Sequence, residues 1–420
     1  MTSHTSASTS GGQSNLPNLP NSPRVLLLAT ERWLTTARLA LALKAAGCDV
    51  QLMALRRHPA MLTGAVSSRY PYRPLSPIAS VAAAIEQAKP DTVVPVDELA
   101  VMHLIELLGS APDEGLAALV TRSLGGPKVL SAAISRITLL QAAQASGVAI
   151  PETTPVASLG EMEAAAEHFG YPLVLKADST AGGRGVRVAN SLAEARAWWP
   201  RLHQPLSLPR SLWRWVRLNE WTHFRPWFKR RMRGVTAQQY QRGAERTAMA
   251  VAYKGELLAF VCFEVVQASK FLGPSTVLRI VEDDVMVNAM RGVVRGLDAT
   301  GLCGFDFMLN DAGVPLLIEM NSRPTQLAHL ALGEGKDLVA AYARAVLGCD
   351  VPDRAAVTQG TLIALYPQEL VRDPQSSILA AAYHDVPWES PELIHYSLQP
   401  VPDVIRKDAR WKKQTVVSKQ

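Results

Sequence analysis

This 420-residue sequence lacks long apolar runs and paired cysteines. No run approaches the roughly 20 apolar residues that a membrane-spanning helix requires, which argues against a chain embedded in a bilayer. Isolated cysteines disfavour both a zinc knuckle and a disulfide framework, and they fit a reducing compartment such as the cytoplasm. The four cysteines, none of them in a Cys-x-x-Cys pair, are Cys48, Cys262, Cys303 and Cys349.

A glycine-rich dinucleotide fingerprint is also missing. Residues 24–30 form a short continuous apolar run, which is typical of a buried parallel strand. The turn from Ala29 to Trp33 contains no glycine, whereas a dinucleotide-binding fold carries Gly-x-Gly-x-x-Gly there, so an NAD site is disfavoured. Strands still alternate with helices, which predicts a parallel sheet with crossover helices. The further elements expected in this region are helices over 33–46 and 78–88 and strands over 48–55 and 91–96.

Asp97 and Glu98 follow the third expected strand directly. Ligand contacts in open parallel sheets usually lie at this end of a strand. Acidic residues also suit the first turn of a helix, where they complement the helix dipole. The sequence favours the second interpretation for this pair.

Positive charge is concentrated in one segment. Residues 201–234 hold nine Arg or Lys and one acid, a local charge of +8 within a chain of net charge +6, so the remainder sums to −2. Tryptophan interleaved with Arg suits an anionic membrane surface, including the inner face of the membrane, or an acidic partner. The same composition describes surfaces that bind single-stranded nucleic acid, but the near-neutral remainder argues against an extended footprint. The alternative is an inserted helical pair whose tryptophans pack on the body.

The two ends of the chain differ in composition from its middle. Residues 1–23 are rich in Ser, Thr, Asn, Gly and Pro, which predicts a disordered leader. This stretch has no basic region followed by an apolar core, so it does not resemble a secretory signal. Residues 351–420 are punctuated by proline and end in a basic stretch over 406–419 that is expected to be solvated.

The middle of the chain is expected to mix strands and helices. Lys176 closes an expected strand over 171–176, and a loop with Gly182, Gly183 and Gly185 follows it. Glycine lets backbone N–H groups approach phosphate oxygens, and a nearby lysine adds positive charge. The alternative is an ordinary hairpin loop beside an exposed lysine. The other expected elements are helices over 131–146, 161–169, 284–297 and 337–347 and strands over 186–189, 235–241, 246–253, 257–266 and 275–283.

Residues 301–323 predict a β-hairpin with an acidic face. Strands over 304–309 and 314–321 flank a turn of Asn, Asp, Ala and Gly, residues that suit tight turns. Folding brings Asp306 near the position opposite Glu319, and alternation puts Glu319 and Asn321 on one face. Two carboxylates and an amide oxygen are ligands that Mg²⁺ accepts, alongside phosphate oxygens. The alternative is a half-exposed hairpin with a polar outer face.

Taken in order, these motifs resemble the ATP-grasp superfamily over residues 24–348, with biotin carboxylase, carbamoyl-phosphate synthetase and the carboxylate–amine ligases as the nearest members. The resemblance implies a mixed α/β and α+β architecture. Its parts would be a Rossmann-like pre-ATP-grasp domain over 24–125, a lid subdomain over 126–240 that contains the 201–234 insertion, a core subdomain over 241–350 that contains a metal site, and an extension over 351–420. The motifs that carry the resemblance are Tyr171–Lys176 with its glycine loop, Gly243–Glu245, Phe305–Phe307 and Glu319–Arg323.

The resemblance also implies roles for single residues. Nucleotide contacts would come from the glycine loop, from a hinge that binds adenine, from an acid that binds the ribose and from cations on the phosphates. Arg136 stands where the family usually has an earlier lysine, and arginine binds phosphate with a different geometry. The residues implied for ATP are Arg136, Lys176, Gly182, Gly183, Gln238, Gln239, Tyr240, Gln241 and Glu245. The implied ligands for Mg²⁺ or Mn²⁺ are Asp306, Glu319 and Asn321, and the implied cations over the phosphoryl group or substrate carboxylate are Arg279 and Arg323.

The activity implied by the resemblance is ATP-dependent ligation of a small-molecule carboxylate to an amine or a thiol, through an acyl phosphate and with release of ADP. No biotinyl-acceptor motif is present, which argues against a carboxylase. The second hypothesis is a non-catalytic or regulatory nucleotide-binding protein that docks to a membrane surface or an acidic partner through residues 201–234.

Overall fold

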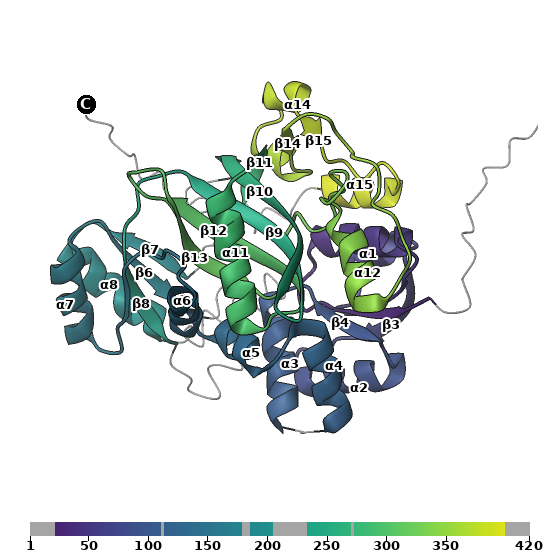
Figure 1. The fold of residues 1–420 in the computed structure, drawn as a ribbon, viewed down its shortest axis with the longest axis horizontal. Helices are drawn as coiled ribbons and strands as arrows, with labels where there is room; N and C mark the ends of the chain where they lie inside the picture. Colours follow the sequence, from purple (N-terminus) through teal and green to yellow (C-terminus); the bar gives the residue numbers. More distant parts are fainter. Residues whose placement is uncertain (1–21, 111–112, 179–184, 205–232, 270–272, 400–420) are drawn as a thin grey trace, which may run out of the picture.

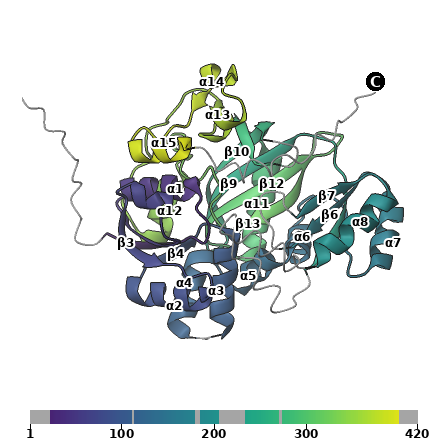
Figure 2. The ribbon, with the colours of Figure 1, turned by 180° about the vertical axis from the view of Figure 1, so that it is seen from behind.

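The computed structural model describes residues 22–110, 113–178, 185–204, 233–269 and 273–399. Nearly all of the expected leader, the loop glycines Gly182 and Gly183, most of the basic insertion and the basic C-terminal stretch lie outside these ranges. Within the described ranges, no helix is both long and apolar enough to cross a membrane. Three sheets lie side by side in the opposite views of Figure 1 and Figure 2, with the seven-stranded sheet in the centre.

The N-terminal sheet is parallel, as the alternation of strands and helices predicts. Its strand order is β3-β2-β1-β4. Strand β3 was missed from the sequence because this edge strand, VSSRYP, contains few apolar residues. Its strands are β1 (Arg24–Leu28), β2 (Asp49–Ala54), β3 (Val66–Pro71) and β4 (Thr92–Pro95), and its helices are α1 (Leu34–Ala45), η1 (Pro59–Leu62), α2 (Pro77–Ala88), α3 (Glu98–Ser110) and α4 (Glu114–Leu124).

The central sheet has seven strands in the order β13-β12-β9-β10-β11-β14-β15. Its apolar faces pack on two different helices. One face buries Phe305 and Phe307 against α11, and the other buries Met249 and Val251 with α12 and the N-terminal sheet. Its strands are β9 (Glu245–Tyr253), β10 (Glu256–Ala268), β11 (Ser275–Val281), β12 (Gly301–Leu309), β13 (Pro315–Asn321), β14 (Leu362–Ala364) and β15 (Tyr383–His384), and its two helices are α11 (Asp284–Leu297) and α12 (Leu338–Leu347).

A smaller sheet has the order β5-β8-β6-β7. One face packs on helices α7 and α8 through residues such as Leu173 and Ala237, and the alternate residues, Lys176 among them, point away from those helices. Figure 1 shows this sheet beside the β12–β13 hairpin. Its elements are β5 (Thr153–Pro155), α7 (Leu159–Phe169), β6 (Leu173–Ala177), β7 (Val186–Ala189), α8 (Leu192–His203) and β8 (Val235–Gln239).

The single helix expected over 131–146 is wrong. The chain instead forms α5 (Pro127–Ile134) and α6 (Arg136–Ala145), separated by Ser135 in an extended conformation. The Ser135 hydroxyl accepts a hydrogen bond from the backbone N–H of Thr138 at 3.3 Å, so it caps α6. Arg136 therefore lies in the first turn of α6 and not in the middle of a longer helix.

Buried charged side chains attach the part of the chain after α12, the C-terminal segment, to the rest of the fold. Strand β14 pairs with β11, and Asp385 lies directly after β15. Arg38 of α1 binds the Asp385 carboxylate at 2.7 Å, and His329 binds its other oxygen at 2.8 Å. This segment also holds the short helices α13 (Gln368–Arg372), α14 (Ile378–Ala381) and α15 (Pro391–Leu398). One carboxylate thus connects the N-terminal helix, the loop after β13 and the end of the chain.

Replacing Asp385 with alanine should lower the free energy of unfolding by about 3 kcal/mol, because Arg38 would stay buried without its partner. Urea unfolding followed by circular dichroism measures this change. The exposed pair of Glu163 and Arg196 is the control, and Glu163→Gln should leave the unfolding midpoint nearly unchanged because solvent screens exposed ion pairs. Equal unfolding midpoints for the two variants would contradict the role assigned to Asp385.

Candidate functional site

The β12–β13 hairpin forms as predicted. Asp306 pairs directly with Glu319 in the antiparallel register, and Asn321 pairs with Gly304. Asp306 accepts hydrogen bonds from the Thr247 hydroxyl at 2.9 Å and from the Asn321 amide at 3.5 Å. The two expected carboxylates and the amide therefore share one face of the central sheet, on the side away from α11.

Burial changes the acidity of this face. The pKa of Asp306 is raised to about 7, mainly by burial and also by the nearby carboxylates of Glu319 and Glu245. Burial also raises the pKa of Glu245, an effect that the Lys176 ammonium opposes. Carboxylates crowded in this way hold each other partly protonated unless a cation joins them.

Lys176 lies close to these acids, although it belongs to the smaller sheet. Its pKa is lowered to about 7, mainly by burial and also by the Arg136 guanidinium, while Glu319, Asp306 and Glu245 act in the opposite direction. Its side chain is 7% exposed, so the ammonium is enclosed between the two sheets. The alternative of an exposed lysine beside an ordinary loop is therefore wrong.

Arg136 connects the two sheets directly. One of its guanidinium nitrogens, Nη2, lies 3.3 Å from the Glu319 carboxylate, and Nη1 donates to the carbonyl oxygen of Ala177 at 3.3 Å. Asp178 accepts from the backbone N–H of Arg136 at 3.3 Å and lies 3.8 Å from Nη1. Among the buried side-chain atoms of the described ranges, Arg136 Nε is one that has no hydrogen-bond partner.

Arg323 lies at the other end of the acidic face. Its Nη2 donates to the Asn321 side-chain oxygen at 3.0 Å, and its Nε donates to Glu98 at 3.3 Å. Glu98 begins α3, as expected for an acid in the first turn of a helix, and it also contacts a predicted site residue. Burial raises the pKa of Glu98, and the neighbouring Arg323 charge opposes that rise.

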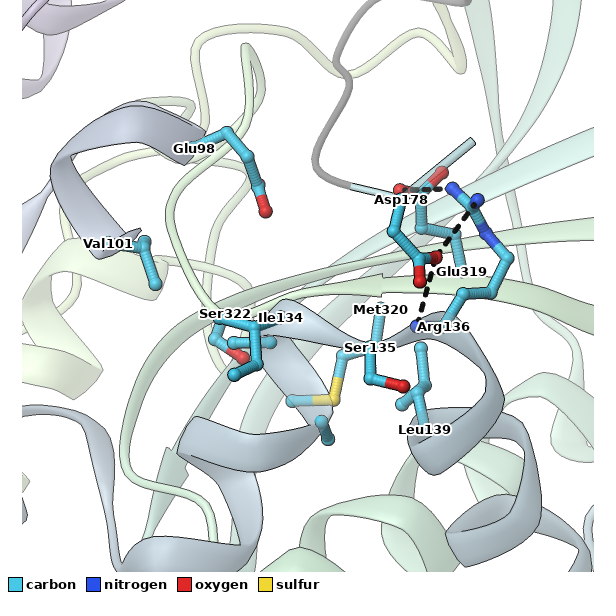
Figure 3. A pocket seen from close by; sticks show the side chains of 12 residues that line it. Glu98, Val101, Ile134, Ser135, Arg136, Leu139, Asp178, Glu319, Met320 and Ser322 are labelled. Carbon is cyan, nitrogen blue, oxygen red and sulfur yellow. Dashed lines mark hydrogen bonds and ion pairs between the residues drawn. The ribbon is translucent and has the colours of Figure 1, made fainter. Parts of the chain in front are cut away.

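A pocket joins these two ends (Figure 3). Glu98 projects from α3 on one side, and Arg136, Asp178 and Glu319 lie together on the other side. The break at Ser135 between α5 and α6 and the side of β13 that carries Met320 complete its lining. Polar groups thus face each other across a partly apolar floor.

The hinge over 238–241 includes the last two residues of β8 and leads toward β9. Gln238 is buried on the same face as Lys176, and its side-chain amide donates to Thr153 at 2.8 Å. Gln239 is exposed and accepts from the Gln241 side chain at 3.2 Å, and Tyr240 lies between them. Among the described residues, the Gln238 side chain binds its own sheet, so a contact of this stretch with adenine stays a prediction.

Arg279 is not part of the cluster, which corrects the expectation for this residue. In the sheet register, Arg279 on β11 lies opposite Glu264 on β10. Glu264 lies opposite Arg246 on β9, and Arg246 lies opposite Phe307 on β12. Phe307 is buried on the α11 face, so Arg279 lies on the sheet face opposite to Asp306. Its guanidinium is exposed and binds Glu264 at 2.8 Å.

Two polar residues of the loop after β13 lie outside the cluster and bind the C-terminal segment. Gln326 accepts a hydrogen bond from the Gln368 side chain at 3.4 Å, and His329 binds Asp385. Conversely, Asp178 was missed from the sequence although it directly follows the Lys176 strand. The sequence signal for it was its position at the start of the glycine loop.

The residues present fit a divalent cation. In the described part of the chain, no group of three or more His, Cys, Asp or Glu side chains gathers as a metal site. The expected set instead holds two carboxylates and one amide, Asp306, Glu319 and Asn321. The raised pKa of Asp306 marks a crowded carboxylate face that a cation would relieve. Arg136 and Arg323 occupy oxygens of Glu319 and Asn321, so these guanidinium groups would have to release them for direct coordination.

Asp306→Asn should make the stability of the fold less sensitive to pH. The folded-state pKa of Asp306 is raised from 3.8 to about 7, so wild-type stability from this group is lost as pH rises through that window. The variant lacks this titration, so between pH 4 and pH 8 its free energy of unfolding should rise relative to that of the wild type by at least about 1 kcal/mol. Urea titrations at both values measure this difference.

Asp311→Asn, in the exposed turn of the same hairpin, is the control and should show no such gain. A difference between wild type and Asp306→Asn that stays constant from pH 4 to pH 8 would contradict the assignment.

Comparisons with known proteins agree with this fold. The family model described as "ATP-grasp domain" matches residues 219–326, and the model for the ATP-binding domain of the carbamoyl-phosphate synthase L chain matches residues 135–202. A search of curated protein sequences finds no match.

Solved structures with the same fold share little sequence with this chain. The carboxyaminoimidazole ribonucleotide synthase of Aspergillus clavatus, complexed with ATP, has a TM-score of 0.57 at 18% identity, with 79% of this chain and 78% of that chain covered. The biotin carboxylase domain of the Hydrogenobacter thermophilus 2-oxoglutarate carboxylase, solved with MgADP and bicarbonate, has a TM-score of 0.56 at 15% identity, over 79% and 71%.

An L-amino acid ligase from Bacillus licheniformis has a TM-score of 0.53 at 14% identity, with 77% of this chain and 75% of that chain covered. At these identities the likeness supports the fold. The family-model matches over residues 135–202 and 219–326 and the three-dimensional likeness together show that this chain has the ATP-grasp fold.

Proposed function

We propose that this chain is an ATP-dependent, ADP-forming ligase that joins a carboxylate to an amine. The observation that carries the proposal is the convergence of Lys176, Arg136 and Arg323 on the face that holds Asp306 and Glu319. These residues come from two sheets and from a helix between them, and they are far apart in the sequence. The ATP and MgADP bound by the structural neighbours, at the same fold, support a nucleotide between the two sheets here.

The reaction has two balanced steps. A carboxylate oxygen of the substrate attacks the γ-phosphorus of ATP, which forms an acyl phosphate and releases ADP. The amine nitrogen then attacks the acyl carbon, and the products are an amide, inorganic phosphate and a proton. Phosphoryl transfer depends mainly on positioning and on neutralisation of charge.

The chain's own residues would divide these tasks. Lys176 and Arg136 are enclosed between the sheets and would bind phosphate oxygens, and the unpartnered Nε of Arg136 is one donor available for this. Arg323 would hold the substrate carboxylate. Asp306, Glu319 and Asn321 would bind Mg²⁺ or Mn²⁺, which, when bound, neutralises charge that develops on the β- and γ-phosphates. A cover over the cleft would keep water from the acyl phosphate.

Glu319→Ala should abolish Mg²⁺-dependent ADP release without unfolding the chain. Glu319 is part of the proposed metal set and lies partly exposed at the edge of the central sheet, and Arg136 keeps Asp178 as an acidic neighbour, so its loss affects chemistry more than packing. A coupled ADP-release assay, screened over pools of carboxylates and amines, measures the activity. Glu256→Ala removes an exposed acid from the same sheet and should keep full activity.

The same screen separates the enzyme from a non-catalytic nucleotide-binding protein. ADP release that requires both a carboxylate and an amine supports the ligase. Nucleotide binding without turnover on any pool, or full activity of the Glu319 variant, would reject it.

Nucleotide binding at pH 8 should take up a proton through Lys176. Its pKa of about 7 leaves the free amine largely neutral at pH 8, and a bound phosphate raises that pKa because it favours the charged form. Calorimetric titration of ATP with EDTA, in buffers of different ionisation enthalpy, measures the uptake. Lys176→Met should reduce it, whereas Lys128→Met, at an exposed lysine, should not. Equal uptake in both variants would contradict the placement of Lys176 at the phosphates.

A further inference from the structure

Arg323 is held in one orientation by contacts on three sides. Its Nε donates to Glu98 at 3.3 Å, Nη2 donates to the Asn321 side chain at 3.0 Å, and Nη1 donates to the Pro324 carbonyl oxygen at 3.4 Å. Its guanidinium carbon lies 5.6 Å from the ring centre of Trp33, over the ring face. The side chain is 8% exposed, so these contacts largely replace water.

These contacts leave one pair of donors. A guanidinium has five N–H groups, one on Nε and two on each terminal nitrogen. Among the described residues, Arg323 uses one on each of its three nitrogens. One N–H on Nη1 and one on Nη2 therefore stay available among the described residues, and the two terminal nitrogens of a guanidinium can together bind the two oxygens of a carboxylate.

The position of Glu98 is itself fixed by its neighbour in the sequence. Asp97 is buried and accepts hydrogen bonds from the backbone N–H of Thr30 at 2.6 Å, from the Thr30 hydroxyl at 2.7 Å and from the backbone N–H of Ala100 at 2.9 Å. It thereby ties the loop after β1 to the first turn of α3. That loop leads to Trp33, whose indole N–H donates to Glu31 at 2.7 Å.

The N-terminal sheet therefore places two groups against one arginine of the central sheet. Glu98 comes from the end of β4 and Trp33 from the end of β1, two parallel strands that are neighbours in the sheet. An ion pair alone could be a simple fastening between two parts of the fold. Here, three contacts constrain one guanidinium: the ion pair with Glu98, the hydrogen bond to Asn321 and the ring of Trp33. They leave one N–H on each of its two terminal nitrogens.

We propose that Glu98 is a positioning residue that aims the free N–H pair of Arg323 at the substrate carboxylate, with Trp33 covering one face of the guanidinium. This inference rests on the proposed ligase function, because it concerns the same substrate group. Glu98 acts through Arg323 and does not contact the reacting atoms. If Asn321 held a metal ion, Glu98 would remain the charged side-chain partner that keeps the guanidinium in place.

The first experiment needs no substrate. In protein labelled with ¹⁵N-arginine, the Nε–H signal of Arg323 is assigned from its absence in Arg323→Lys, and its exchange with water is measured. Glu98→Ala should speed this exchange at least tenfold, because the Nε–H loses its charged acceptor. Glu98→Gln keeps an oxygen acceptor and should give an intermediate rate. Glu114→Ala, which removes the first-turn acid of the neighbouring helix α4, should leave the rate unchanged.

The second experiment uses a carboxylate that supports ADP release in the screen. Glu98→Ala should raise the KM for that carboxylate about tenfold and leave the dissociation constant of ATP unchanged, with Glu98→Gln between wild type and alanine. A loss confined to kcat would overturn the positioning role. An equal loss of affinity for ATP would overturn it as well, because a general structural defect weakens both binding sites.

The two experiments distinguish failure of the ligase function from failure of the positioning role of Glu98. If no carboxylate supports turnover, the ligase function fails, while the exchange experiment still reports whether Glu98 holds Arg323. Unchanged Nε–H exchange in Glu98→Ala overturns the inference whatever the activity. A urea unfolding midpoint within error of the wild type confirms that each variant is folded before its rates are compared.

Discussion

Opposite charges enclosed between two sheets are the constraint on which the rest of this structure depends. Lys176 and Arg136 are buried, and each would be costly to enclose without a compensating charge. Their compensation comes from Asp306 and Glu319, on strands of another sheet more than 100 residues further along the chain. Neither sheet could present this cluster alone, so the site exists only when the two are docked.

The backbone explains why so few segments supply so many groups. The β12–β13 pairing puts Asp306 beside Glu319, and alternation puts Asn321 on the same face. The break at Ser135 starts a new helix, so Arg136 reaches both Glu319 and the end of β6. A polar face inside the fold departs from the apolar pattern expected of buried strands. Such departures are common where a protein binds ligands.

Much of this arrangement could be predicted from the sequence, and the exceptions have physical reasons. The hairpin was predictable because its turn residues and strand period are local signals, and the resemblance to ATP-grasp proteins placed Lys176 near it. Arg279 was assigned wrongly because the face to which a strand residue points depends on cross-strand register, which one sequence does not reveal. Glu98 looked like a helix-capping acid, and only the docking of the N-terminal sheet brings it to Arg323. The split at Ser135 was missed because Ser is compatible with both a helix interior and a cap.

The late position of β14 and β15 in the chain has a consequence for synthesis. Strand β11 is covered by β14, which lies some 80 residues further along the sequence. A nascent chain that has completed the hairpin and α12 therefore still presents an open strand edge, and open edges invite pairing with other chains. The segment that contains β14 and β15 covers this edge, and it leaves the ribosome only after the rest of the central sheet has been made.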